Sequence, residues 1–259
     1  MGKITEALKK AAQERLERLE KRPTTGTSYI VKKVEGSQID PHIVTYFEPK
    51  SPVAEQYRIL RTNIQSLNSK KPPKVITISS SIHGEGKTVT SINLAIAMAH
   101  DLNNKKILLI DSDLRRGRVS NYLGIKPEKG LSDLLTNGVA IEDTLLSIGI
   151  NNLVILPSGK PPHNPAELLG STKMKDLLLH FRDKFDYIIL DSPPIIPLTD
   201  PGVIGAISDG VIMVVQAGRT QRGIVRHAED LLNQAQAKIL GYVLTNIEYH
   251  LPHYIYRYL

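Results

Sequence analysis

A short glycine-rich run, Gly84-Glu-Gly-Lys-Thr88, constrains this sequence more than any other feature. It directly follows residues 75–79, an apolar stretch rich in β-branched side chains that predicts a buried strand, and it leads into a helical pattern over residues 88–101. Glycines between a strand and a helix let consecutive backbone N–H groups face one anion, and the helix N-terminus adds partial positive charge. The run therefore predicts a phosphate-binding loop.

The residues of this loop predict contacts with a nucleotide. We expect Lys87 to reach the β- and γ-phosphates of ATP, and Thr88 to place its hydroxyl on Mg²⁺. The first glycine of the usual eight-residue motif is replaced by Ser81, so the motif is a variant. The cofactor-binding residues expected in and beside the loop are His83, Gly84, Glu85, Gly86, Lys87, Thr88 and Val89.

Strand and helix patterns alternate along the rest of the chain. Further short apolar runs occupy residues 107–110, 153–156, 187–190, 211–215 and 242–244, and helical patterns cover residues 172–184 and 221–237. Near-continuous apolar runs suit strands that are covered on both faces, and their alternation with helices indicates βαβ units. The expected fold is therefore α/β, a mostly parallel sheet flanked by helices, of the P-loop NTPase class with a deviant Walker A motif.

Aspartates follow two of the expected strands. Asp111 and Asp113 come after residues 107–110, and Asp191 comes after residues 187–190. Each aspartate alone could simply cap the next element. In a parallel sheet, however, ligands bind at the carboxyl ends of the strands, where carboxylates can hold a metal ion beside a phosphate.

Composition excludes several functions and divides the chain. The 259 residues contain no cysteine, which excludes disulfides and thiolate sites, and the net charge of +7 is spread out, so we expect no specific nucleic-acid binding. Residues 1–22 have the period of an amphipathic helix, which either docks on a partner or membrane surface or packs on its own domain. We expect a linker over residues 23–50, the nucleotide-binding domain over residues 51–246 and a tail over residues 247–259.

The motifs in this order resemble the bacterial tyrosine kinases, called BY-kinases. The resemblance covers about residues 51–246 and includes Asp111-x-Asp113-x-Arg115, Asp191-x-x-Pro194 and Glu55-x-x-Arg58-x-x-Arg61. It implies ATP and Mg²⁺ as cofactors, Asp111 as candidate base, and Asp113 and Asp191 as supports for the ion. The implied catalytic residues are Lys87, Asp111 and Asp113, and the implied metal-binding residues are Thr88, Asp113 and Asp191. Either Thr245 or Asn246 would read the adenine, and Glu55, Arg58 and Arg61 would lie at a subunit contact in a homo-oligomer that can close into a ring.

The tail carries a second part of the resemblance. Tyr249, Tyr254, Tyr256 and Tyr258 look like the cluster that these kinases phosphorylate on themselves, here between subunits. The resemblance implies a cytoplasmic protein that regulates exopolysaccharide or capsule synthesis and export, held at the inner membrane face by a separate membrane-spanning partner and served by a cognate phosphotyrosine phosphatase. The alternative is a non-kinase ATPase switch of the septum-positioning or partition type. Those ATPases typically carry a lysine where this chain has Ile82, and they do not account for the tyrosine tail.

Overall fold

A computed structural model describes residues 31–34, 38–67 and 72–247 of the chain. The helix expected over residues 1–22 and the four tyrosines of the tail lie outside the described residues.

The described residues form an eight-stranded sheet with the order β1-β4-β5-β3-β6-β2-β7-β8. Six strands are parallel, while β4 runs antiparallel to β5 and carries β1 parallel to itself at the edge. This arrangement confirms the mostly parallel sheet. The strands are β1 (Lys32–Lys33), β2 (Val75–Ser80), β3 (Ile107–Asp111), β4 (Leu146–Ser147), β5 (Leu153–Leu156), β6 (Tyr187–Asp191), β7 (Gly210–Gln216) and β8 (Ile239–Thr245).

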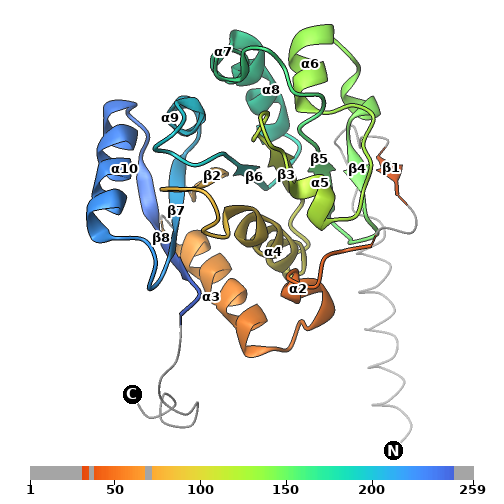
Figure 1. Ribbon diagram of the computed structural model, residues 1–259. Coiled ribbons are helices and arrows are strands. Elements are labelled where there is room, and N and C mark those ends of the chain that lie inside the picture. The colour runs from red at the N-terminus through yellow and green to blue at the C-terminus, as the bar shows by residue number, and fades with distance from the viewer. Residues whose placement is uncertain (1–30, 35–37, 68–71, 248–259) are drawn as a thin grey trace, which may run out of the picture.

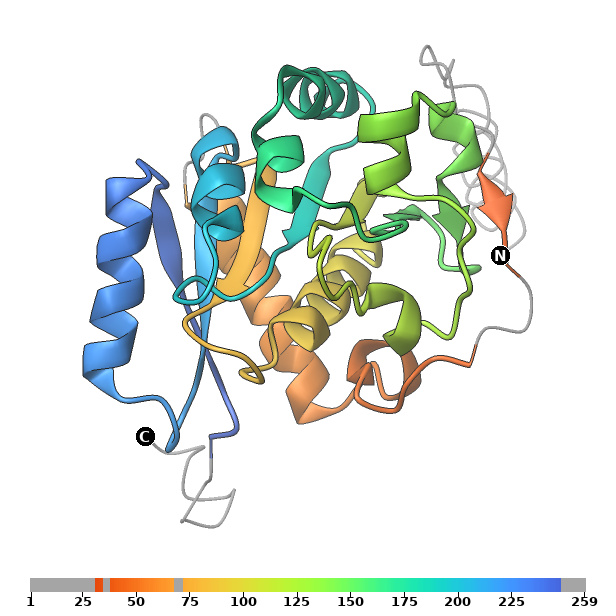
Figure 2. The same ribbon diagram turned by 45° about the horizontal axis from the view of Figure 1, so that its top comes forward.

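Helices cover both faces of the sheet (Figures 1 and 2). Every residue of β2, β3 and β6 is buried, as expected for strands packed on two sides. Alternate strand residues face opposite layers, so Ile76 packs with α4 while Val75 packs with α8. The helical elements are α2 (Val44–Phe47), α3 (Pro52–Ser66), α4 (Lys87–Ala99), α5 (Val119–Tyr122), α6 (Leu131–Asn137), η1 (Ile141–Asp143), α7 (Pro165–Gly170), α8 (Thr172–Arg182), α9 (Asp200–Ile207) and α10 (Arg222–Gln234).

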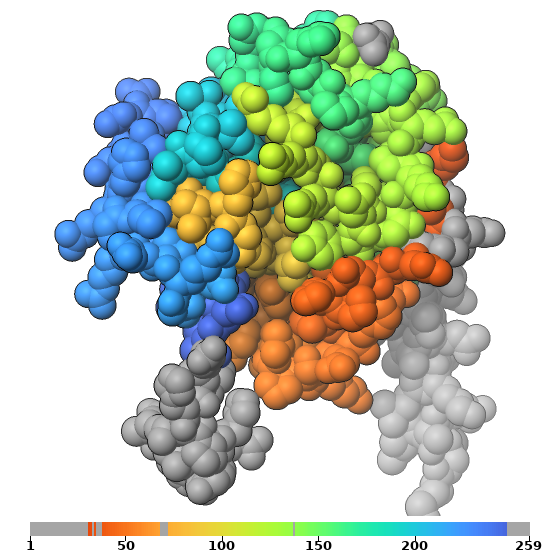
Figure 3. Space-filling model, viewed as in Figure 1, coloured from red at the N-terminus to blue at the C-terminus, as the bar shows by residue number. Residues whose placement is uncertain are grey.

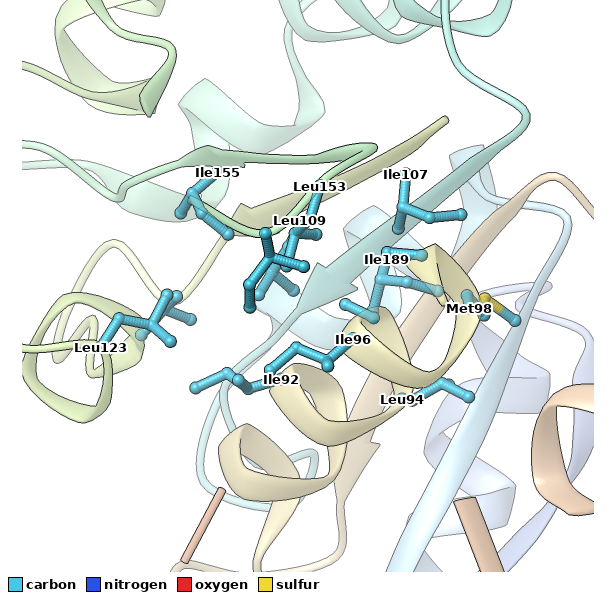
Figure 4. Packing of buried hydrophobic residues seen from close by; sticks show 14 of the residues in the cluster. Ile92, Leu94, Ile96, Met98, Ile107, Leu109, Leu123, Leu153, Ile155 and Ile189 are labelled. Carbon is cyan, nitrogen blue, oxygen red and sulfur yellow. The ribbon is translucent and has the colours of Figure 1, made fainter. Parts of the chain in front are cut away.

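Helix α4 lies in the centre of the molecule and is buried from Thr90 to its end. Its side chains Ile92 and Ile96 point toward Leu109 and Ile189 of the sheet (Figure 4). Full burial of one such isoleucine stabilises the fold by about 1.5–3 kcal/mol. The hydrophobic core therefore fixes the position of the α4 N-terminus, where the phosphate loop ends.

The segment before α3 is part of the domain, so the linker expected over residues 23–50 is wrong for its described part. Ile43 is fully buried in the core that surrounds α4. The backbone N–H and the hydroxyl of Thr45 both donate to Oδ1 of Asn93, each at 2.9 Å. Strand β1 adds two residues to the edge of the sheet. Isolated apolar residues without a helix or strand period hid this packing in the sequence.

No helix among the described residues combines the length and the apolar character that crossing a bilayer requires.

Candidate nucleotide-binding site

The phosphate loop spans the gap between the end of β2 at Ser80 and the start of α4 at Lys87. Gly84 and Gly86 have φ angles of 82° and 92°, in the left-handed region that favours glycine. A Cβ at Gly84 would also lie 3.0 Å from the Arg219 guanidinium. The two glycines therefore allow the turn that places backbone N–H groups at the N-terminus of α4, where an anion binds favourably.

Glu85 braces this loop from inside the protein. Its carboxylate accepts hydrogen bonds from the Ile82 N–H at 2.8 Å, the Gln216 N–H at 3.2 Å and the Thr220 hydroxyl at 2.5 Å. The residue is 1% exposed. Its side chain thus ties the loop to the end of β7 at Gln216 and to Thr220 in the segment that follows. Of the groups of Glu85, only the backbone N–H is then left for the expected contact with the nucleotide.

The end of β8 also contacts the loop. The Thr245 hydroxyl donates to the Glu85 carbonyl at 2.8 Å, and its methyl group faces Gly86. Asn246 follows directly, exposed and with a φ angle of 53°. Both candidates for adenine recognition therefore lie beside the phosphate loop, with Thr245 in direct contact with it. Arg219, which the sequence analysis did not select, donates to the Gly84 carbonyl at 3.3 Å.

The strand-end aspartates meet at the loop, as their positions in the sequence predict. Asp111 and Asp191 are register partners on the neighbouring strands β3 and β6. The Thr88 hydroxyl donates to Oδ2 of Asp191 at 2.7 Å, and Nζ of Lys87 lies 3.2 Å from Oδ2 of Asp113 and 4.0 Å from Oδ2 of Asp191. The structure thus brings Lys87, Thr88, Asp113 and Asp191 into one cluster.

Burial and mutual repulsion set the protonation behaviour of this cluster. Burial raises the pKa of Asp111 well above its usual range, and the neighbouring Asp191 adds to that rise. The pKa of Asp191 is also raised, chiefly by burial, although Lys87 opposes the change. Burial alone would lower the pKa of Lys87, but the nearby carboxylates outweigh it and raise that pKa, so Lys87 carries its positive charge at neutral pH. The cluster is therefore a buried cation surrounded by carboxylates.

Asp111 holds the segment that follows β3. Its carboxylate is fully buried and accepts from the N–H groups of Val119 at 3.1 Å and Asp113 at 3.3 Å. Gly117 is required here because a Cβ at this position would lie 2.1 Å from the Ser158 hydroxyl oxygen and 2.8 Å from the Asp111 carboxylate. The segment that presents Asp113 is consequently anchored to the end of β3.

Arg115 forms an ion pair that the sequence analysis missed. Its Nε and Nη2 atoms donate to the two carboxylate oxygens of Asp200 at 2.7 and 3.0 Å. The Asp200 side chain is fully buried at the start of α9. In the sequence Asp200 precedes a proline at a helix start, so it could be interpreted only as a capping residue. The bidentate pair fixes the segment after β3 to a second helix.

The donor set of the cluster fits Mg²⁺. Mg²⁺ prefers oxygen ligands and commonly takes one or two carboxylates together with substrate phosphates and water. The Thr88 hydroxyl and the Asp113 and Asp191 carboxylates supply such oxygens beside the loop. Among the described residues no group of three or more histidines, cysteines, aspartates and glutamates could hold a metal ion without other ligands.

The residues expected at a subunit contact lie on α3, away from the loop. Nε of Arg58 donates to Oε2 of Glu55 at 2.7 Å, and both side chains are partly exposed. Arg61 instead donates to the Ala97 carbonyl of α4 at 2.8 Å. The structure therefore leaves Glu55 and Arg58 partly exposed, although Arg58 also donates to the Pro49 carbonyl at 2.6 Å, whereas Arg61 is engaged with α4.

Comparisons with known proteins agree with this geometry. Residues 73–238 match the family model described as an AAA domain. The chain is 35% identical over 214 residues to the tyrosine-protein kinase YwqD of Bacillus subtilis (strain 168), covering 83% of this chain and 90% of the relative. Among solved structures, the chimerical protein CapA2B2 superposes with a TM-score of 0.77 at 29% identity, covering 85% of this chain and 95% of the other.

A more distant similarity concerns the Pyrococcus furiosus cell division ATPase MinD. Its TM-score is 0.56 at 26% identity, and the match covers 66% of this chain and 71% of the other. This similarity supports the P-loop NTPase class expected from the sequence.

Proposed function

Since the chain belongs to the bacterial tyrosine-protein kinase family, we propose that it is an autokinase that transfers the γ-phosphoryl group of ATP to tyrosines of its own tail. The observation that carries the proposal is the convergence of Lys87, Thr88, Asp113 and Asp191 on the phosphate loop. The acceptors are Tyr249, Tyr254, Tyr256 and Tyr258, which follow the last strand.

The chemistry needs mainly position and charge stabilisation, because negative charge spreads over the γ-phosphate oxygens in the transition state. The tyrosine oxygen forms the new bond to the γ-phosphorus, the bond to the β–γ bridging oxygen breaks, and ADP leaves. Lys87 and the N–H groups of residues 83–89 bind the phosphates. Bound Mg²⁺, held by Thr88, Asp113 and Asp191, would neutralise phosphate charge.

The phenolic proton must pass to a carboxylate. By resemblance the base is Asp111, whose pKa burial raises above the usual range of an aspartate. In its ionised form such a carboxylate accepts a proton more strongly than an ordinary aspartate. Asp111 is fully buried and held by two backbone N–H groups. In this role it receives the proton late, as the tyrosine oxygen bonds to phosphorus.

Transfer takes place between subunits, since a short tail reaches a neighbour's site more readily than its own. The subunit contact is formed by Glu55 and Arg58, with Arg61 holding α3 in place through the Ala97 carbonyl. The assembly is a homo-oligomer that can close into a ring.

The oligomer lies at the inner face of the membrane through a separate membrane-spanning partner. It regulates exopolysaccharide or capsule synthesis and export, and a phosphotyrosine phosphatase removes the phosphate from its tail.

Intact mass after incubation with Mg-ATP tests the proposal. The full chain is expected to gain mass in steps of one phosphate, mapped to tail tyrosines, and Lys87→Met is expected to gain none while keeping its fold. A Lys87→Met chain that is phosphorylated like the parent would refute the site assignment.

The second candidate function is an ATPase switch, which the fold similarity to the cell division ATPase favours. In that case the chain would hydrolyse ATP, with or without a membrane partner, and its tail tyrosines would never acquire phosphate.

A further inference from the structure

A groove lies between α10 and the last strand, β8, and none of Lys87, Thr88, Asp113 and Asp191 lines it. It adjoins the phosphate loop, since its lining residues Gln216 and Thr220 donate to Glu85. It has a volume of about 420 Å³. The elements that form it stand side by side at one end of the sheet, in the blue part of the ribbon (Figures 1 and 2), and α10 reaches the surface there (Figure 3). Its lining residues are Val215, Gln216, Ala217, Thr220, Arg222, Val225, Arg226, Glu229, Tyr242 and Leu244.

The groove combines an apolar floor with two arginines. Val215 and Val225 line it, and Leu244 and the Tyr242 ring expose 57% and 50% of their surface. Arg222 and Arg226 are four residues apart and therefore share one face of α10. Both are exposed, and neither forms an ion pair with another described residue. Such a site suits a ligand with an aromatic ring and a doubly charged anion.

The acidic residue of the groove is already engaged. Oε1 of Glu229 accepts a hydrogen bond from the Tyr242 hydroxyl at 2.8 Å. Partial burial and this carboxylate together raise the pKa of Tyr242 to about 12, so Tyr242 stays neutral. Glu229 is three residues beyond Arg226 and shares its face of α10, but it is seven residues beyond Arg222, or roughly 10 Å along the helix axis. The end of the groove near Arg222 therefore stays positive.

The chain's own tail begins beside that positive end. Leu244 pairs with Val215 in parallel register, so β8 ends where β7 leads into α10. The last described residue is Ile247, and residues 248–259 follow it. An extended chain spans about 3.3–3.6 Å per residue, so Tyr254, seven residues after Ile247, can lie anywhere within roughly 25 Å of it.

We infer that this groove binds phosphotyrosine of the chain's own tail, with Arg222 and Arg226 on the phosphate and the apolar floor under the ring. The inference rests on the proposed autokinase function. A phosphate on tyrosine adds about −1.5 to −2 charge and accepts charge-assisted hydrogen bonds from arginine. The unmodified tail carries one acidic side chain, Glu248 at its start, beside His250, His253 and Arg257, so it offers no doubly charged group next to an aromatic ring. Docking in this groove withholds a phosphorylated tail from the neighbouring subunit's active site.

A synthetic peptide tests the groove without requiring kinase activity. The probe is a fluorescent peptide of residues 248–259, phosphorylated on Tyr254, Tyr256 and Tyr258 or left unmodified. The protein is the full chain with its four tail tyrosines changed to phenylalanine, so that its own tail carries no phosphate. Fluorescence anisotropy is expected to show the phosphopeptide binding about tenfold or more tighter than the unmodified peptide.

Matched variants locate that binding. Arg222→Gln with Arg226→Gln is expected to bring the phosphopeptide down to the affinity of the unmodified peptide. Lys126→Gln with Lys175→Gln removes the same charge from exposed positions outside the groove and is expected to leave binding unchanged. Equal affinity for the two peptides, full affinity in the double arginine variant, or an equal loss in the lysine control would each overturn the inference.

A second measurement tests whether the tail binds its own groove. The full-length chain is first autophosphorylated and then treated with a broad-specificity tyrosine phosphatase at several protein concentrations. The parent is expected to lose phosphate several-fold more slowly than Arg222→Gln with Arg226→Gln, independently of concentration. Equal rates would overturn docking of the tail on its own groove. A chain that never acquires phosphate would refute the autokinase proposal, and the peptide experiment would still report on the groove.

Discussion

Replacing Glu85 by glutamine tests whether the buried brace holds the phosphate loop. One carboxylate oxygen accepts from the Ile82 N–H, and the other accepts from the Gln216 N–H and the Thr220 hydroxyl. The amide keeps the volume of the side chain but has only one oxygen. The Thr220 hydroxyl can rotate and accept from the new NH₂ group, whereas a backbone N–H can only donate. Whichever way the amide turns, one of the two backbone N–H groups loses its acceptor.

The structure sets the magnitude of this change. Leaving one buried N–H without an acceptor costs about 1–3 kcal/mol. We therefore expect Glu85→Gln to lower the free energy of unfolding by about that amount. ATP affinity should fall by about tenfold, the equivalent of 1.4 kcal/mol, because the loop is no longer held in its binding conformation.

Urea unfolding and nucleotide titration on the same preparations measure both effects. Glu142→Gln makes the same chemical change at an exposed position and is expected to stay within about 0.5 kcal/mol of the parent. Thr220→Val removes one side-chain donor and leaves both Glu85 oxygens as acceptors for the two backbone N–H groups, so its effect should be smaller than that of Glu85→Gln. If Glu85→Gln unfolds and binds ATP like the parent, the brace does not hold the loop.

Three further predictions concern other parts of the molecule. Asp191→Asn should weaken Mg-dependent ATP binding by about tenfold and metal-free binding much less, because its expected partner is the ion; equal losses in calorimetric titrations would remove Asp191 from the metal site. Arg58→Ala should reduce oligomer size and autophosphorylation together in light scattering and anti-phosphotyrosine blots, and full activity from a monomeric variant would contradict transfer between subunits. Burial favours a higher pKa for Asp209, but Arg182 and two backbone N–H groups outweigh it and lower that pKa. Its contribution to stability is then present above about pH 4 and is lost as pH falls further, so Asp209→Asn should lose less stability than the parent on acidification, and parallel losses would refute this account.

Local patterns predicted six of the eight described strands, three of the helices and the strand-end positions of the aspartates, but not β1, β4 or the shorter helices. The apolar runs after residue 74 all became strands, and the parallel arrangement placed Asp111 and Asp191 at one edge in the same register. The carboxylates could be found because strand ends of a parallel sheet converge, a property that needs no knowledge of side-chain contacts.

Contacts distant in the sequence could not be predicted in this way. Glu85 bonds to Thr220 and Arg115 bonds to Asp200, and each pair is joined only by the packing of separate elements. Ile43 was assigned to a linker because α2, which begins directly after it, is only four residues long and has no readable period. The tail tyrosines lie outside the described residues, so their role as phosphoacceptors stays a prediction.

The burial of α4 also bears on how such a domain can diversify. Ala95, Ala97 and Ala99 are each at most 4% exposed, so a larger side chain at any of them would have to displace the sheet or α3. Helix α8, by contrast, has exposed Lys175 and Leu179 on its outer side. Larger side chains in α4, the helix that follows the phosphate loop, are therefore expected to destabilise the fold. Substitutions at exposed positions of outer helices such as α8 should change stability little. Related chains can acquire new binding partners there without altering the nucleotide site.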